Sequence, residues 1–188
     1  MAFAEFEFRS KELCRYVPFD VILPNDTNLE AREGNCHYGR EPKTLMLLGG
    51  CGAIHTGLAY PETFEKIAGL SSALIIHDVT GKKEDFEDSL GNYEYYHQIF
   101  GDLDLLEKSA FNPEIQIKTL KEKGTELPEI YLTCGINDPF LECNREFYEF
   151  LRQEEIEAVY LEKEGNHDWF FWDRCLEDAI LWFLGGEL

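Results

Sequence analysis

The sequence has 188 residues and a formal net charge of -20, with 37 acidic side chains against 17 basic ones. Such a surface repels phosphate backbones and anionic lipids, so the composition excludes nucleic-acid binding and docking on membranes. It favours a neutral or cationic small-molecule substrate and is compatible with a homo-oligomer. No apolar run reaches the roughly 20 residues that a membrane span needs.

The chain is interpreted as one domain over residues 1–188, because no stretch rich in Pro, Ser or Gly divides it. Residues 1–7 carry neither a basic start nor an apolar core, so no secretory signal is predicted and a cytoplasmic location is expected. The six cysteines then indicate buried or reactive thiols more than a disulfide framework.

The first predicted elements are two strands. Aromatic residues alternate with polar ones over 3–8, and 16–23 is a mostly apolar run that ends at a turn, so the two form an antiparallel hairpin or an edge pair. An exposed, polar connection follows over 25–42. Residues 43–48 end in an apolar run bounded by glycines, which is typical of a buried central strand, and they turn directly into a helix over 54–60.

Strands and helices alternate through the rest of the chain. One strand is expected within 64–76, and 77–128 is interpreted as a partial cap of short helices that ends in a longer helix over 113–123. Further strands are predicted over 129–134 and 158–162, and further helices over 144–153 and 171–184. This alternation predicts the α/β class, with a mostly parallel sheet of about six strands and helices on both faces.

A histidine and an aspartate each follow one of the later strands. Asp138 comes after the strand 129–134, and His167 comes after the strand 158–162. The carboxyl ends of parallel strands meet at one edge of a sheet, so His167 is predicted to be a general base that Asp138 orients. Asp168 is the rival acid, but it is expected to point to the N-terminus of the following helix. The alternative is that His167 only caps that helix.

The nucleophile is harder to find, because no Gly-x-Ser-x-Gly motif occurs in the sequence. Cys51 lies on a glycine-rich turn after the strand 43–48, where a helix N-terminus would lower the pKa of a thiol. The amide of Gly52 would then be an oxyanion donor. A cysteine in such a turn is also often a small apolar filler. Ser71 lies between small residues, but the apolar run 74–76 follows where a helix would have to begin.

A metal site is the other chemistry that the spacing allows. Cys51 and His55 lie one helical turn apart, and Cys36 and His37 precede them, which gives four soft ligands in one region. Adjacent residues rarely bind one ion together, so neither a metal nor a cofactor is expected.

Several segments, spread over most of the chain, carry a family resemblance. They are Phe-Arg-Ser at 8–10, Val-Ile-Leu-Pro at 21–24, the strand 42–48, the helix with its flanks at 52–62, Thr-Cys-Gly-x-x-Asp at 133–138 and Gly-x-His-Asp-Trp at 165–169. Together they resemble the tributyrin-esterase and esterase D group of the α/β hydrolases, which includes S-formylglutathione hydrolases and feruloyl esterases. The resemblance implies a shortened α/β-hydrolase fold that hydrolyses carboxylic esters through an acyl-enzyme, with Asp138 and His167 as acid and base.

The resemblance also implies an internal deletion. In that group a His-Gly loop and several strands and helices separate the strand that matches 42–48 from Gly-x-Ser-x-Gly, whereas here Leu48 runs directly into two glycines and Cys51. Leu47 thereby takes the place of the serine. Because the loss of one oxyanion donor costs on the order of a hundredfold in rate, activity is expected to be impaired. The deletion is natural, engineered or a segment missing from the sequence as written.

Two functions follow from these interpretations. In the first, the chain is a weak carboxylesterase or thioesterase for small acyl esters, with Cys51 as nucleophile, His167 as base, Asp138 as orienting acid and the Gly52 amide as oxyanion donor. In the second, the chain is a natural or engineered fold without catalysis, which keeps the acid and base as a relic and acts as a scaffold or binding module.

Overall fold

The computed structural model describes residues 2–10, 15–23, 45–46 and 50–185. The chain falls into two compact units, Met1–Pro42 and Lys43–Leu188. The interpretation of 1–188 as one domain stays a prediction. Among the helices of the described residues, none combines the length and the apolar character that crossing a membrane requires.

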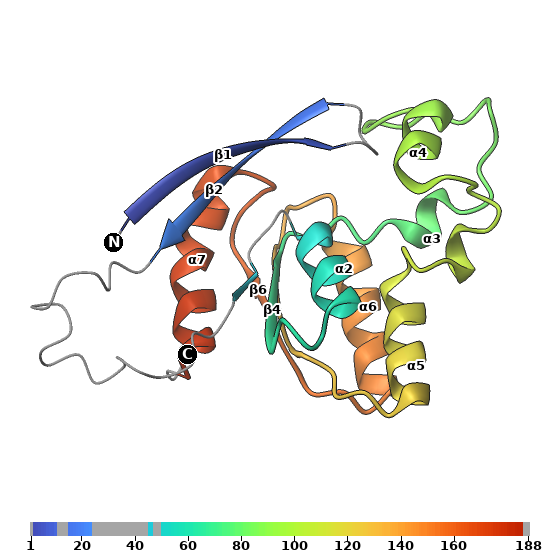
Figure 1. The fold of residues 1–188 in the computed structure, drawn as a ribbon. Coiled ribbons are helices and arrows are strands. Elements are labelled where there is room, and N and C mark those ends of the chain that lie inside the picture. Colours follow the sequence, from blue (N-terminus) through green and yellow to red (C-terminus); the bar gives the residue numbers. More distant parts are fainter. Residues whose placement is uncertain (1, 11–14, 24–44, 47–49, 186–188) are drawn as a thin grey trace, which may run out of the picture. The chain divides into compact units, whose positions relative to one another are not determined.

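The N-terminal unit contains an antiparallel pair of strands, β1 (Ala2–Ser10) and β2 (Arg15–Leu23), which are drawn in blue in Figure 1. The two strands pair along their full lengths. Pro18 lies within β2 and has no N–H to donate, which a two-stranded sheet tolerates because each strand keeps one edge free. The predicted hairpin is confirmed, and the connection 25–42 lies outside the described residues.

The second unit is built around a parallel sheet. In spatial order its strands are β3 (Leu45–Met46), β4 (Lys66–Leu70), β5 (Glu129–Gly135) and β6 (Ala158–Lys163). All three pairings are parallel, and each strand pairs with the next one along the chain. The α/β class is confirmed. The parallel sheet is smaller than predicted, because it has four described strands and the other two described strands form the separate hairpin.

The expected central position of the strand over 43–48 is wrong for the described residues. β3 pairs with β4 and has no second neighbour among them, so β4 and β5 are the inner strands. Apolar side chains indicate that the two faces of a strand are buried. They do not indicate how many neighbouring strands its backbone pairs with, which decides between an edge and a central position. The expected helix does follow at once, since α2 (Cys51–Ala59) begins just after this strand.

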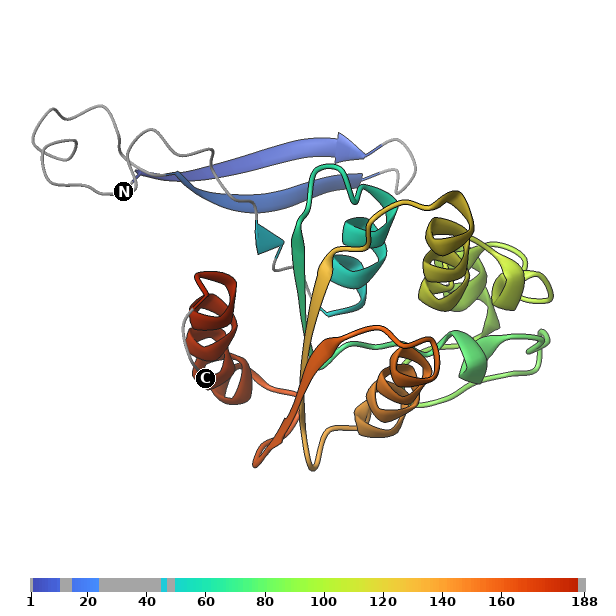
Figure 2. The same cartoon turned by 90° about the horizontal axis from the view of Figure 1, so that it is seen from below.

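Helices cover both faces of the sheet (Figure 2). α2, α5 (Pro113–Lys123) and α6 (Leu141–Gln153) lie on one face, and α7 (Trp169–Phe183) lies on the other. The predicted elements over 113–184 are thus confirmed, although α6 and α7 each begin before the predicted residue.

The two cores follow the alternation of side chains along the strands. In β5, Ile130 and Leu132 belong to the core on the face of α2, α5 and α6. Tyr131 lies between them and packs on the other face, where its ring centroid is 5.3 Å from that of Trp182 in α7. A strand that is apolar at successive positions is therefore buried on both faces.

Short helices occur in the predicted cap region 77–128 and at its border. They are α3 (Ile76–Val79), α4 (Tyr93–Phe100) and the 3-10 helix η1 (Leu106–Lys108). This region has a small core of its own, made of Ile76, Val79, Tyr96, Leu103 and Leu106. Its action as a cap stays a prediction.

Gly57 marks a close approach between α2 and β4, and its replacement tests that packing. A Cβ at this position would overlap the side chain of Ile67. We expect Gly57→Ala to lower the free energy of unfolding by about 1–3 kcal/mol, although alanine is the better helix former. Urea unfolding followed by circular dichroism measures the change. Gly52→Ala, at an exposed position of the same helix, is the control, and an equal loss in both variants would contradict the proposed close packing.

Candidate active site

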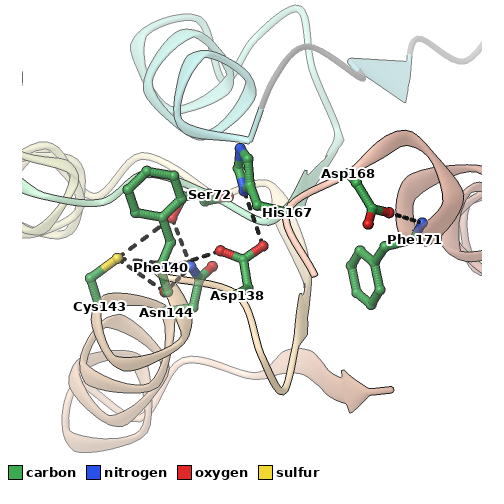
Figure 3. Close-up of polar contacts among 8 residues, drawn as sticks. All are labelled: Ser72, Asp138, Phe140, Cys143, Asn144, His167, Asp168 and Phe171. Carbon is green, nitrogen blue, oxygen red and sulfur yellow. Dashed lines mark hydrogen bonds and ion pairs between the residues drawn. The ribbon is translucent and has the colours of Figure 1, made fainter. Parts of the chain in front are cut away.

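Two loops at the carboxyl edge of the sheet carry the predicted acid and base. β5 ends at Gly135 and leads to Asp138, and β6 ends at Lys163 and leads to His167. Because Gly135 lies opposite Lys163 in the ladder, the two loops leave the sheet side by side. Nδ1 of His167 lies 3.0 Å from Oδ2 of Asp138 (Figure 3). The contact expected from the sequence is present.

Backbone contacts tie these two loops together. The N–H of Asn137 donates to the carbonyl of Gly165 at 3.1 Å. A Cβ on Gly135 would lie 2.5 Å from that same carbonyl oxygen, so a side chain would push the loops apart. Gly165 has a φ of 153°, which favours glycine. The two glycines therefore help to set the distance between acid and base.

Asp138 is buried, and both of its carboxylate oxygens have partners. Oδ1 accepts from the N–H of Phe140 at 2.8 Å, and Oδ2 contacts His167. The side chain of Asp138 is 0% exposed. Since a carboxylate can only accept, we assign the shared proton to Nδ1 of His167, which leaves Nε2 free to accept another. An imidazole in this state can act as a general base.

Asp168 has a different partner. Its Oδ1 accepts from the N–H of Phe171 at 2.9 Å, which caps the N-terminus of α7 (Figure 3). The expectation that Asp168 points to this helix is confirmed, and Asp138 is the carboxylate that contacts the imidazole.

The imidazole of His167 lines a pocket of about 580 Å³. In Figure 3 its second ring nitrogen points toward the start of α2. The pocket is lined by Gly50, Cys51, Leu70, Ser71, Ala73, Phe140, His167, Trp169, Trp172, Asp173 and Leu176. Most of these side chains are apolar, and Asp173 adds a carboxylate, so the pocket suits an apolar group beside the imidazole.

Two aromatic rings hold the imidazole edge-on. The rings of Phe140 and Trp172 each lie 4.9 Å from that of His167, both in T-shaped arrangements. These contacts limit the rotation of the imidazole and keep water from part of its surface. Sequence reasoning did not single out either ring, because a lone aromatic residue near a loop gives no signal of its own.

A larger hollow, of about 710 Å³, lies at the opposite edge of the sheet. It includes Glu129 and Ala158, at which β5 and β6 begin, together with Arg152. None of the predicted site residues lines it. The pocket beside His167 is therefore the one in which the predicted chemistry can take place.

Cys51 lies on the wall of the His167 pocket, but its surroundings disfavour the thiolate form of its side chain. It is the first residue of α2, and its side chain packs against the larger hydrophobic core. Burial raises the pKa of the thiol above its usual value. The expected lowering by the helix N-terminus is therefore outweighed by desolvation. Gly52 is exposed and is not among the described residues that line this pocket.

Ser71 is the second residue with a nucleophilic atom on the pocket wall. It follows β4 and has a φ of 51°, which is uncommon for a residue other than glycine. Its hydroxyl is buried and has no hydrogen-bond partner among the described residues. No helix begins directly after it, as the sequence indicated, because α3 begins only at Ile76.

The proposed metal ligands do not come together within the described part of the chain, where no group of three or more His, Cys, Asp or Glu residues is arranged to hold an ion. His55 stacks on Phe111 with ring centroids 5.4 Å apart. Cys36 and His37 lie outside the described residues.

The chain is 40% identical over 137 residues to an acetyl esterase of Caldicellulosiruptor saccharolyticus. The match covers 73% of this chain and 52% of that protein, so the chain spans about half the length of the curated relative that it matches. No protein-family model matches the chain. By sequence, the chain is similar to an esterase.

Two solved structures from Staphylococcus aureus share the fold. They are the fluorophosphonate-binding serine hydrolase FphF with bound substrate, at a TM-score of 0.74 and 16% identity, and the S-formylglutathione hydrolase FrmB, at 0.72 and 18%. Each alignment covers 97% of this chain and 98% of the other. At these identities the likeness shows the fold, which is that of an α/β hydrolase. The predicted resemblance to esterase-type α/β hydrolases is confirmed.

The pH dependence of alkylation tests the environment of Cys51. Because burial raises the pKa of its thiol above the usual value, we expect slow reaction with iodoacetamide near neutral pH and a rate that still increases at pH values where the rate of the unfolded protein has levelled off. Mass spectrometry of the Cys51 peptide measures the rate, and the protein unfolded in urea is the control. A rate that levels off below about pH 8 would instead indicate an activated thiolate.

Proposed function

We propose that the chain is a carboxylic-ester hydrolase for small, neutral acyl esters, with His167 as general base and Asp138 as its orienting acid. The contact of 3.0 Å between these residues, beside an apolar pocket, is the observation that carries the proposal. The similarity to an acetyl esterase supports the ester as substrate. The net charge of -20 disfavours anionic esters.

In the proposed reaction, Nε2 of His167 accepts the proton of the attacking group as that group bonds to the ester carbonyl carbon. Asp138 stabilises the imidazolium that forms, and the negative charge collects on the carbonyl oxygen. The imidazolium then gives its proton to the leaving alcohol, and water releases the acyl group by the same steps in a second cycle. We assign the attacking group to Cys51, which lines the pocket, and the oxyanion donor to the backbone N–H of the next residue, Gly52, although Gly52 itself is not among the described lining residues.

We further propose that the rate is low. The sequence lacks Gly-x-Ser-x-Gly, and the resemblance places Leu47 where the serine would be. The raised pKa of the Cys51 thiol keeps the attacking sulfur protonated until His167 accepts its proton. An internal deletion accounts for the loss of the serine and of the His-Gly loop. A cytoplasmic location is part of the same proposal.

The alternative function is binding of an ester or a related apolar ligand without turnover. The packing of Cys51 against the core favours it, because a thiol held there has little freedom to approach a bound carbonyl. In that case the pair of His167 and Asp138 is a relic that still shapes one wall of the pocket.

Hydrolysis of p-nitrophenyl acetate by the protein and its variants tests the proposal. We expect His167→Ala to lower the rate by about a hundredfold or more, because the base is lost. His77→Ala is the matched control. This histidine also contacts a carboxylate, that of Glu114 at 2.9 Å, but it does not line the pocket. Its removal therefore measures how much hydrolysis an ordinary surface imidazole contributes. Equal rates in the two variants would overturn the enzyme proposal in favour of binding.

Two further variants in the same assay identify the attacking group. Loss of activity and of an acyl adduct in Cys51→Ala, with both retained in Ser71→Ala, would support Cys51. The reverse result would transfer that role to Ser71. Activity in both variants without an adduct by mass spectrometry would show direct attack by water that His167 activates.

A further inference from the structure

Asn144 is a fully buried polar residue that bridges two walls of the pocket. It lies on α6 and is 0% exposed. Its Nδ2 donates to the carbonyl of Ser72 and to the carbonyl of Phe140, both at 2.7 Å (Figure 3). Since both neighbours are acceptors, the amide nitrogen and not its oxygen has to face them.

The bond from Asn144 to the carbonyl of Phe140 affects the acid and the base. Phe140 accepts from Asn144 through its carbonyl and donates its own N–H to Oδ1 of Asp138 at 2.8 Å. The ring of Phe140 packs edge-on against His167, with centroids 4.9 Å apart. A shift of Phe140 would therefore move the carboxylate and the imidazole together.

The bond from Asn144 to the carbonyl of Ser72 affects the start of α2. Ser72 lies against Gly50, the N-cap of α2, so closely that a Cβ on Gly50 would overlap the Ser72 backbone. Gly50 and Cys51 form the wall of the pocket toward which the free nitrogen of His167 points. By binding the carbonyl of Ser72, Asn144 positions the residue against which Gly50 packs.

An ordinary helical role explains only one of these bonds. A side-chain bond from Asn144 to the carbonyl of Phe140 is local, and such bonds are common for asparagine. The bond to Ser72 joins residues 72 positions apart in the chain. Burial of an amide is unfavourable unless its hydrogen bonds are made, and here Nδ2 is paired while the buried Oδ1 has no hydrogen-bond partner among the described residues. A leucine would fill similar space without this cost. The nearby thiol of Cys143 approaches the same carbonyls, but a thiol is only a weak donor.

We propose that Asn144 is a positioning residue. Through the carbonyls of Phe140 and Ser72 it sets the position of His167 relative to the start of α2. This role rests on the proposed function, since it concerns the alignment of the base with the attacking group. Its geometric part, the support of the contact between His167 and Asp138, is measurable without activity.

The test compares Asn144→Leu, which keeps the approximate volume but cannot donate, with Phe147→Leu, a core change on the same helix. In protein labelled with ¹⁵N-histidine, we expect the Nδ1 proton of His167 to give a protected signal that persists in Phe147→Leu and is lost or broadened in Asn144→Leu. His167→Gln assigns the signal. If Asn144→Leu does not fold, Asn144→Ser, which is too short to reach both carbonyls, is expected to lose the signal as well.

Kinetics with p-nitrophenyl acetate provide the second readout. Misplacement of the base is expected to lower kcat by about tenfold to a hundredfold in the Asn144 variant, with KM changed by less than about twofold. An unchanged Nδ1 signal and an unchanged kcat in a folded Asn144 variant would overturn the positioning role. If the unaltered protein has no esterase activity, the proposed function fails, and the Nδ1 signal alone decides the role of Asn144.

Discussion

The second unit depends on the parallel pairing of β5 with β6. Parallel neighbours need a crossover, and α6 provides it while burying the sheet on one face. The register fixes which side chains reach which core. A slip of one residue would turn Tyr131 away from α7 and would separate Gly135 from the loop after β6. The same pairing that builds the core thus also brings the acid and the base together.

Burial of Asp138 imposes a second requirement. A carboxylate removed from water is costly by several kcal/mol unless hydrogen bonds or an opposite charge compensate it. Here the N–H of Phe140 and the imidazole of His167 are the compensating partners. The conformation of the loop after β5 and the position of the imidazole therefore depend on each other. The low polarity around Asp138 also strengthens its attraction for an imidazolium.

Much of this arrangement could be predicted from the sequence, where a local rule applies. Asn112 and Gly124 mark the ends of α5 because a side-chain cap and a left-handed residue are local requirements. Asp138 and His167 could be paired because both follow strands of one parallel sheet. Asp168 could be assigned to a helix cap from its position alone.

What the sequence could not reveal depends on contacts between distant segments. The position of β3 at the edge of the described sheet depends on which backbones pair, not on its side chains. The raised pKa of Cys51 depends on core residues contributed by several helices. The bridge made by Asn144 joins residues far apart in the chain, and its surroundings on α6 look like any amphipathic helix. The left-handed conformation of Ser71 follows from the turn that leaves β4.

A single residue, Asp168, separates His167 from α7. The first two residues of this helix, Trp169 and Phe170, are 80% and 84% exposed, so the first turn gains little from burial until Phe171. Local opening of such a turn takes less free energy than unfolding of the sheet. Fraying of this turn would disturb the residues next to the imidazole while the sheet stays folded, although the contact with Asp138 also holds the ring. We therefore expect the site to lose order at a lower temperature than the sheet to which it is attached.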